Sequence, residues 1–337
     1  MKRTKIRSYL LALAMGVTLV CGQLGGYAVA ATPKKAPATS INNNSNSLKL
    51  SPLRSDLTLD PGKSGVVKTY VTNLTKDTIM LKAIENDFVS GDEKGTPSLI
   101  LDENSFAPSH SLKKFMVPMP NVTISANATA EVDVKVNVPK NAQAGGYFGA
   151  IRFAPAGSSS QQIALTSSVA SLILLTVSGP AVERLTLTNF DVQQNGGTGS
   201  SFRTPDDLGL LIRFMNQGSV QEAPFGQVSV EKGHKILYSA NFNQDQPRDE
   251  ILPDSARRWT VPLKKFGKFG KYTVSGTFGY GAKGETIQIS KTVWIIPSTV
   301  IMAIIGGILF LIAIIGAFWF MARNYKRRIL KSSRRRY

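Results

Sequence analysis

Two glycine-rich segments of the sequence resemble phosphate-binding motifs, but neither has the context that such a motif needs. Gly62-Lys63-Ser64 matches the end of a P-loop, yet the full motif requires glycine at the position of Leu57 and a helix after the serine. Residues 279–284 fit the G-x-G-x-x-G pattern, which binds dinucleotides when a strand precedes it and a helix follows it. A β-rich run follows each segment instead. We therefore predict a turn at the first segment and a hairpin loop between the last two strands at the second.

Residues that carry acid–base, metal or redox chemistry are few and scattered. The chain has two histidines, His110 and His234, and one cysteine, Cys21, which is too few for a Cys/His zinc site. The acid pairs at residues 92–93 and 249–250 lie in expected loops, outside any acid–base motif. No G-x-S-x-G or H-E-x-x-H sequence occurs. We therefore expect a protein that is not an enzyme and that uses no metal ion or cofactor.

Calcium binding and N-glycosylation are the two remaining chemical patterns, and both are generic. Loop acids such as Asp102 and Glu103 supply calcium-type ligands without the spacing of an EF-hand, so calcium stays an open alternative. Asn73, Asn121 and Asn127 each begin a glycosylation sequon, a triplet that also arises by chance in strands rich in Asn and Thr. We give these sequons no weight.

The chain of 337 residues has a formal net charge of +18, and most of this charge lies at its two ends. Residues 1–31 hold four cations and residues 323–337 hold eight, and neither segment holds an acid. The middle of the chain has 28 cations and 22 acids, a net charge of +6. Nucleic acid is therefore not an expected partner.

Residues 1–30 have the pattern of a secretory signal peptide. A basic start leads into an apolar run over residues 10–20, and the small residues Ala28 and Ala30 precede the expected cleavage point. The alternative is an uncleaved anchor, but the apolar run is shorter than the about 17–25 residues that a membrane span needs. Residues 31–47 are rich in Pro, Ala, Ser and Asn and predict a flexible linker.

Residues 297–321 predict one transmembrane helix. At 1.5 Å per residue these 25 almost wholly apolar residues span about 37 Å, enough to cross a hydrocarbon core of ~30 Å. Trp294 and Trp319 have the placement of interfacial anchors. The residues that follow the span are basic: Arg323, Lys326, Arg327 and Arg328. The positive-inside rule then places the tail, residues 322–337, in the cytoplasm and the N-terminal domains outside the cell membrane.

Short β-rich runs separated by turn signals fill the region between the linker and the span. The first set is expected at residues 48–53, 56–59, 66–74, 78–84, 98–101, 114–117, 122–124, 130–138, 147–153 and 169–177. The second set is expected at residues 182–187, 208–215, 226–231, 235–240, 258–262, 270–278 and 286–293, with a glycine-rich loop at 195–201 between its first two members. Gly179 and Pro180 break the chain between the sets. We therefore predict a mainly β protein with two tandem Ig-like antiparallel β-sandwich domains, residues 48–180 and 181–296.

Several segments resemble the WxL-interacting protein family of bacterial surface proteins. The segments are residues 53–65 (LRSDLTLDPGKSG) before a strand ending VTN, residues 138–153 (VPKNAQAGGYFGAIRF), and Trp259 with residues 270–280 (GKYTVSGTFGY) and 293–297 (VWIIP). The order of signal peptide, two β domains, span and basic tail is also similar. The resemblance implies a peptidoglycan-associated first domain and a second domain that binds a partner or host ligand.

Tyr147, Arg152 and Arg54 are the candidate ligand-binding residues. Sugars favour an aromatic face beside hydrogen-bonding groups, and the two glycines before Tyr147 let a backbone approach closely. The alternative is that Tyr147 and Phe148 are ordinary alternating strand residues. Lysines and aromatics also alternate over residues 264–272, where either a solvated hairpin or contact with wall polymer or lipid would account for the pattern.

The sequence as a whole predicts a non-catalytic, membrane-anchored surface protein that binds cell-wall glycan, a surface partner, or both. The alternative is a scaffold or adhesion protein that recruits another surface protein and has no affinity for glycan. Neither the ligand nor the oligomeric state follows from the sequence.

Overall fold

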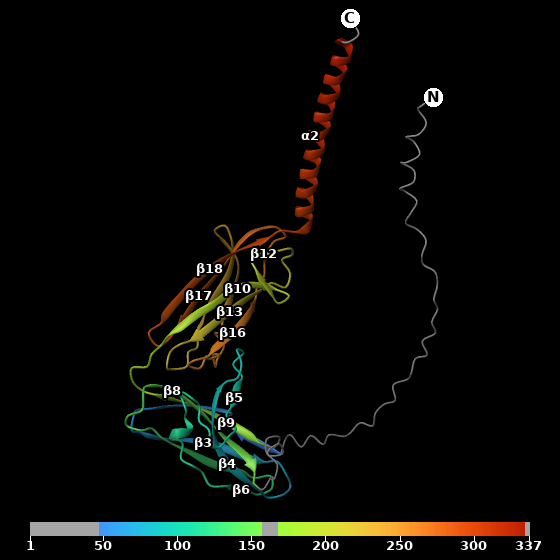
Figure 1. Ribbon diagram of the computed structural model, residues 1–337. Helices are drawn as coiled ribbons and strands as arrows, with labels where there is room; N and C mark the ends of the chain where they lie inside the picture. The colour runs from blue at the N-terminus through green and yellow to red at the C-terminus, as the bar shows by residue number, and fades with distance from the viewer. Residues whose placement is uncertain (1–46, 157–167, 334–337) are drawn as a thin grey trace, which may run out of the picture. The chain divides into compact units, whose positions relative to one another are not determined.

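The computed structural model describes residues 47–156 and 168–333, with side chains as far as Tyr325. The expected signal peptide with Ala28 and Ala30, nearly all of the expected linker, and the side chains of Lys326, Arg327 and Arg328 lie outside the described residues. The described part is mainly β, with four sheets followed by one long helix, α2 (Ser298–Ser333) (Figure 1).

The first two sheets are formed by residues 48–177. The three-stranded sheet has the order β1-β3-β7, with β1 (Leu48–Ser51), β3 (Ser64–Asn73) and β7 (Thr129–Asn137). The six-stranded sheet has the order β2-β9-β8-β4-β5, with β2 (Arg54–Leu59), β9 (Val169–Val177), β8 (Gly145–Pro155), β4 (Ile79–Ser90) and β5 (Pro97–Leu99). Its sixth strand, β6 (Val122–Ile124), pairs with β4.

The inner faces of these two sheets share one hydrophobic core. On β7 the valines at 132, 134 and 136 are buried and alternate with exposed charged residues, as the sequence pattern predicts. They belong to the same cluster as Ile151 and Phe153 of β8 and Ile173 of β9, on the other sheet. Each such buried side chain contributes about 1.5–3 kcal/mol relative to an exposed one.

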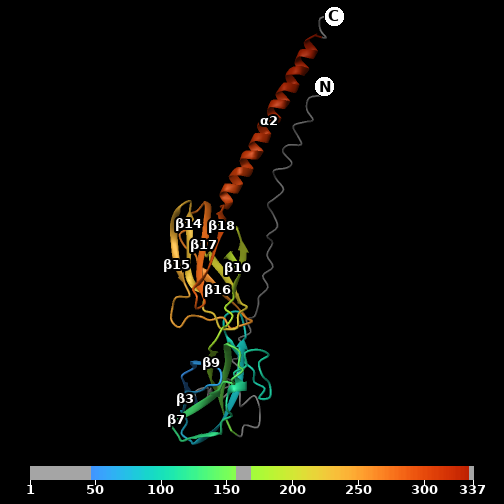
Figure 2. The same ribbon diagram turned by 90° about the vertical axis from the view of Figure 1, so that its left-hand side faces the viewer.

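The other two sheets are formed by residues 185–295. The four-stranded sheet has the order β11-β10-β13-β16, with β11 (Gly197–Gly199), β10 (Leu185–Gln194), β13 (Gly209–Asn216) and β16 (Ala256–Pro262). The five-stranded sheet has the order β12-β18-β17-β14-β15, with β12 (Ser201–Phe202), β18 (Glu285–Ile295), β17 (Gly270–Tyr280), β14 (Phe225–Lys232) and β15 (Lys235–Phe242) (Figure 2).

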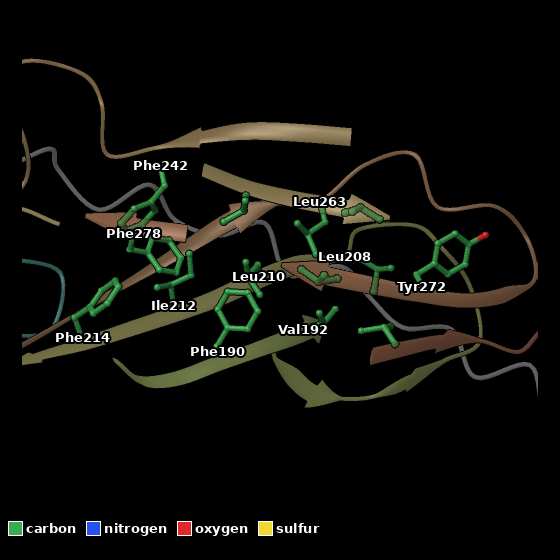
Figure 3. Close-up of a cluster of buried hydrophobic side chains, with 14 of the residues drawn as sticks. Phe190, Val192, Leu208, Leu210, Ile212, Phe214, Phe242, Leu263, Tyr272 and Phe278 are labelled. Atoms are coloured by element: carbon green, nitrogen blue, oxygen red, sulfur yellow. The ribbon is translucent and has the colours of Figure 1, made fainter. Parts of the chain in front are cut away.

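Aromatic rings pack against one another at one end of the second hydrophobic core (Figure 3). The ring of Phe278 lies 5.3 Å from that of Phe214 and 5.1 Å from that of Phe242, both edge to face. The Trp259 ring packs edge to face at 5.2 Å from Phe242. Edge-to-face pairs add about 0.5–1.5 kcal/mol beyond the burial of area. The predicted domain boundary at residues 179–180 lies between this core and the first one.

Two strand pairs correct the prediction of purely antiparallel sheets, because β2 runs parallel to β9 and β12 runs parallel to β18. Pro52 and Leu53 alone separate β1 from β2, yet these two strands belong to different sheets. The chain therefore crosses from one sheet to the other and places β2 at the edge of the second sheet without reversing direction.

Several other predictions also differ from the structure. The strand expected at residues 78–84 is β4, which runs on to Ser90. In the segment 114–117, Lys114 and Phe115 belong to a 3₁₀ turn, η1 (Lys113–Phe115), because Asp87 accepts the Lys113 amide and Leu112 accepts the Phe115 amide. Met116 then forms an isolated bridge with Val136 of β7. The strand expected at residues 182–187 is β10, which runs on to Gln194. The loop expected at residues 195–201 contains β11. The turn expected around Gly62 and Lys63 is confirmed, because the Lys63 amide donates to the carbonyl of Asp60. The hairpin loop expected at residues 279–284 is confirmed between β17 and β18, but it is shorter than expected, since residues 279–280 belong to β17.

Helix α2 begins at Ser298, one residue after the predicted start of the span. Its segment Ser298–Tyr325 is long and apolar enough to cross a membrane, and no part of it is buried against the rest of the described chain. Trp319 is 63% exposed, with the Arg323 guanidinium 5.1 Å from its ring, and Trp294 is 42% exposed on β18. Exposed Leu, Ile and Phe side chains on every face are typical of a helix whose surroundings are lipid.

Candidate functional site

Tyr147 faces the interior of the first pair of sheets. Its ring lies 4.7 Å from that of Phe115, and its hydroxyl donates to the carbonyl of Gln143 at 3.0 Å. Burial raises the pKa of the phenol above its ordinary value. The side chain therefore packs against the first core and presents only part of its surface to solvent.

Arg152 lies on the opposite face of the same strand. β8 pairs with β4 and β9 without a register shift, so residues five positions apart point to opposite sides of the sheet. Arg152 is 6% exposed, and its Nε donates to Oδ1 of Asn86 at 3.1 Å. Desolvation lowers the pKa of its guanidinium. The structure does not bring Arg152 and Tyr147 together into one contact surface.

Arg54 forms an ion pair that joins β2 to the segment before β16. Its Nη2 atom lies 2.8 Å from Oε2 of Glu250 and 2.7 Å from Oδ1 of Asp56. Burial alone would lower the pKa of Arg54, but the hydrogen bonds to the two carboxylates outweigh it and raise the pKa. Arg54 therefore connects the first pair of sheets to a residue beyond 180.

The two glycines before Tyr147 lie against a turn of the same chain. The Gly146 amide donates to the carbonyl of Ser219 at 2.7 Å. Gly145 has φ +145°, and a Cβ at this position would lie 2.4 Å from the same oxygen. The sequence correctly indicated a close backbone approach here. In the structure the approaching backbone is the turn around Ser219, which follows β13.

A cavity of about 190 Å³ lies beside Arg54. Phe88, Leu172 and Leu174 form its apolar part. Arg54, Glu250 and Arg257 supply guanidinium and carboxylate groups. The volume is below the ~300–1,000 Å³ of typical ligand pockets. The cavity can therefore accept one side chain or one sugar-sized polar group, held between opposite charges.

A second ionic contact between the same two parts of the chain was missed from the sequence. Oε1 of Glu93 accepts from Arg213 at 2.7 Å, and Oε2 lies 3.3 Å from Nε of Arg258. The hydrogen bond from Arg213 holds the pKa of Glu93 below its ordinary value. These partners are 120 or more positions apart in sequence, so only the fold reveals them. Glu93, predicted to be a plain loop acid, is thus an ion-pair residue.

His110 and Asp102 have structural partners in the described part of the chain, whereas His234 is exposed in the hairpin between β14 and β15. A ring nitrogen of His110 lies 2.6 Å from the carbonyl of Gly146, and Asp102 accepts hydrogen bonds from the amide of Asn104 and the hydroxyl of Ser105. Among the described residues no group of three or more His, Cys, Asp or Glu is placed to hold a metal ion.

These observations define a class: a mainly β protein of packed sheets that ends in a helix able to span a membrane. No protein-family model matches the chain, and no curated protein matches its sequence.

Solved structures of fimbrial chaperones share a distant likeness with it. A chaperone–tip adhesin complex of CFA/I fimbriae is 12% identical, with 74% of this chain and 99% of that chain covered and a TM-score of 0.38. The class 5 fimbrial chaperone CfaA is 11% identical over 74% and 99%, with a TM-score of 0.37. The E. coli chaperone DraB is 18% identical over 73% and 96%, with a TM-score of 0.30. At such low scores and identities, what these proteins do is not carried over to this chain.

Proposed function

We propose that the chain is a non-catalytic surface protein, anchored by α2 in the bacterial cell membrane, with two tandem Ig-like domains outside. One observation carries the proposal: Ile296 and Pro297 alone separate β18 from a helix with no buried part. A helix that exposes Ile, Leu and Phe on all sides is stable in lipid and not in water. The basic residues after the helix support a cytoplasmic C-terminus.

Protease treatment of intact cells tests this arrangement. An epitope tag before Leu48 should be removed by added protease, and a tag after Tyr337 should be protected until the membrane is opened. Alkaline washing should leave the full chain in the membrane fraction. A chain without residues 298–337 should be released. Release of the full chain by alkali, or cleavage of the C-terminal tag in intact cells, would contradict the proposal.

The resemblance to the WxL-interacting proteins supports this function, since residues 138–153 and the order of parts along the chain are similar to those of that family. Membership implies that the external part holds cell-wall glycan through its first domain. The cavity beside Arg54 is our candidate contact, because it combines guanidinium, carboxylate and apolar groups. Tyr147 and Arg152 could contribute only to separate contacts, since they lie on opposite faces of β8.

A pull-down of the full chain, in mild detergent, with purified peptidoglycan tests the glycan contact. We expect binding that falls about tenfold or more in Arg54→Gln, because a hydrogen bond to a charged group contributes about 1.5–3 kcal/mol. Arg184→Gln is the matched control, since Arg184 is exposed and is absent from the cavity lining. Binding no stronger than that of an unrelated membrane-anchored β-sandwich protein would contradict the proposal.

The second candidate function is recruitment of another surface protein without glycan affinity. The observation that favours it is β15, an eight-residue strand at the outer edge of the five-stranded sheet. An edge strand offers unpaired amide and carbonyl groups to a partner strand. Cross-linking in intact cells from Ser239 on β15 would capture such a partner. A chain that binds peptidoglycan and yields no cross-link favours the first function.

A further inference from the structure

Lysines gather at the end of the second pair of sheets that leads into α2. They come from the two ends of the β14–β15 hairpin, from the segment between β16 and β17, and from the start of β17. We call these six residues the lysine patch: Lys232, Lys235, Lys264, Lys265, Lys268 and Lys271. All six are exposed, and among the described residues none of them forms an ion pair.

The segment between β16 and β17 is fixed on its inner side and exposed on its outer side. Phe266 packs against Tyr272 with ring centres 5.1 Å apart, and the Tyr272 hydroxyl accepts the amide of Gly267 at 2.8 Å. Phe269 points away from this core and is 53% exposed. The hairpin before β15 joins the segment, because Nζ of Lys232 donates to the carbonyl of Phe269. Ile236, next to that hairpin, is 62% exposed.

Chain connectivity keeps the lysine patch close to the start of α2. Lys271 lies directly across the β17–β18 pair from Trp294, which is 42% exposed. Trp294 precedes Ser298 by four residues, which span at most about 14 Å of extended chain. A cross-strand pair adds about 5 Å. Whatever angle the helix takes, Lys271 is thus within about 20 Å of the point where the apolar segment begins.

The charge at this end of the sheets is strongly positive. Besides the lysine patch, Arg203 is exposed on the loop whose Leu208 carbonyl accepts the amide of Leu263. The acids at the same end are Asp206, Asp207 and Glu231, so seven cations face three acids. Each lysine near an anionic bilayer contributes about 1 kcal/mol of attraction, which falls off over a Debye length of about 8 Å at physiological salt.

We infer that the lysine patch, with Phe269 and Trp294, docks on anionic phospholipid head groups of the membrane that α2 crosses. The inference rests on the membrane anchoring proposed above. Lysines bind the phosphate groups by charge, and the exposed aromatic rings enter the interfacial layer. The contact would fix the second pair of sheets against the bilayer, and it would leave residues 48–177 to reach outward. Wall polymer is the competing anionic partner, but it does not account for exposed aromatic rings next to an apolar helix.

A fluorescent label at position 269 measures the contact directly. Cys21 is the only cysteine of the chain, so a Cys21→Ala, Phe269→Cys chain takes one nitrobenzoxadiazole label. The full labelled chain is reconstituted in phosphatidylcholine vesicles with or without phosphatidylglycerol. A spin-labelled lipid then quenches the probe according to its depth. A second chain labelled at Leu53→Cys, 68% exposed on the first pair of sheets, reports quenching that does not depend on the patch.

We expect quenching at position 269 to rise about twofold or more with phosphatidylglycerol and to fall at high salt. The substitutions Lys264→Gln, Lys265→Gln, Lys268→Gln and Lys271→Gln together should remove most of the rise. The matched control changes four exposed lysines of the first pair of sheets: Lys63→Gln, Lys76→Gln, Lys135→Gln and Lys140→Gln. This control should leave the quenching unchanged.

Equal quenching with and without phosphatidylglycerol, or an undiminished rise in the four-lysine variant, would overturn the inference. A probe that responds to added peptidoglycan or wall polymer, and not to phosphatidylglycerol, would overturn it in favour of wall polymer. Flotation of the same vesicles shows whether the chain is inserted at all. Failure of insertion would contradict the proposed anchoring, whereas insertion without quenching at position 269 would contradict this inference alone.

Discussion

Asn73 at the end of β3 and Asn216 at the end of β13 make the same hydrogen bonds in the two pairs of sheets. Each Nδ2 donates to the carbonyl four residues later, at 2.8 Å in both cases. Each Oδ1 accepts the amide two residues later, at 2.9 Å for Asn73 and 2.8 Å for Asn216. Both side chains are fully buried. Each half of the β region therefore turns the chain at the end of one strand with the same set of side-chain hydrogen bonds.

Asn73→Asp and Asn216→Asp should each lower the free energy of unfolding by about 2–4 kcal/mol. The aspartate keeps the shape but loses the Nδ2 donors, so a buried carboxylate would face the carbonyl oxygens of neighbouring residues. Urea unfolding of the full chain in detergent, followed by far-ultraviolet circular dichroism so that both pairs of sheets are seen, measures the loss. Asn141→Asp is the control at an exposed position and should change little. A loss at Asn73 as small as that at Asn141 would show that the hydrogen bonds do not hold the corner.

The same geometry bears on the sequon that begins at Asn73. Its Nδ2 atom is the acceptor of glycan in N-glycosylation, and here it is buried and donates to three carbonyls. The folded chain therefore cannot present Asn73 for modification, which supports giving that sequon no weight.

The raised pKa of Glu222 predicts that the folded state loses stability as the pH rises. Burial and the nearby carboxylate of Glu183 raise its pKa to about 7 from an ordinary value of 4.5, although Oε2 accepts the amide of Gly281. Oε1 is buried without a hydrogen-bond partner among the described residues. The folded state therefore favours the protonated form. Its contribution, up to about 3 kcal/mol, is fully present below pH 4.5 and is lost as the pH rises through 7.

Glu222→Gln should remove this pH dependence, because an amide does not ionise. The midpoint of thermal unfolding, measured from pH 5 to pH 8, should fall less in Glu222→Gln than in the parent chain. Glu183→Gln should reduce the slope in part, since it removes the like charge that adds to the shift. Glu285→Gln is the control, because Glu285 is exposed in the β17–β18 hairpin that also holds Gly281. An unchanged slope in Glu222→Gln would assign the pH dependence to other groups.

Strands with strict alternation were predicted well from the sequence, and an interrupted strand was not. The strand expected at residues 130–138 corresponds to β7, because a half-buried strand shows every second side chain to the core. The strand expected at 169–177 corresponds to β9, which is a nearly continuous apolar run rather than an alternating one. The prediction for β10 ended too early, at residue 187, because the register of this strand shifts between Leu187 and Asn189. The shift places Phe190 and Val192 on the core side out of phase with the residues before it, so the sequence shows no period of two.

The contacts between the two halves of the β region could not be predicted, but part of the site could have been. Tyr147 and Arg152 are five positions apart, which alone places them on opposite faces of a continuous strand. Arg54 and Glu250 are 196 positions apart, and Glu93 and Arg213 are 120 apart. Ion pairs of this kind depend on how the halves meet, for which a single sequence has no periodic signal.

Gly145→Ala should destabilise the contact between β8 and the turn at Ser219. The added Cβ would lie 2.4 Å from the Ser219 carbonyl oxygen, and φ is +145°, so both sterics and backbone strain act. We expect a loss of about 2–4 kcal/mol in urea unfolding and faster amide exchange at Gly146, which donates to Ser219. Gly284→Ala is the matched control, with φ +70° and no atom within 4 Å of its Cβ. Gly284→Ala should lower the free energy of unfolding only by the backbone strain, about 1–2 kcal/mol. An equal loss at both positions would show that the contact with Ser219 adds nothing.

Arg54 should be coupled more strongly to Glu250 than to Asp56, although both carboxylates are within 2.8 Å. The Asp56 side chain is 60% exposed and the Glu250 side chain 22%, so water and salt screen the first pair far more. Double-mutant cycles of Arg54→Gln with Glu250→Gln and with Asp56→Asn measure the two couplings on one scale. We expect about 0.5–1 kcal/mol for Glu250 and less than about 0.5 kcal/mol for Asp56. A larger coupling to Asp56 would mean that Arg54 mainly orders its own strand, and the junction would then depend on Glu93 and the turn at Ser219.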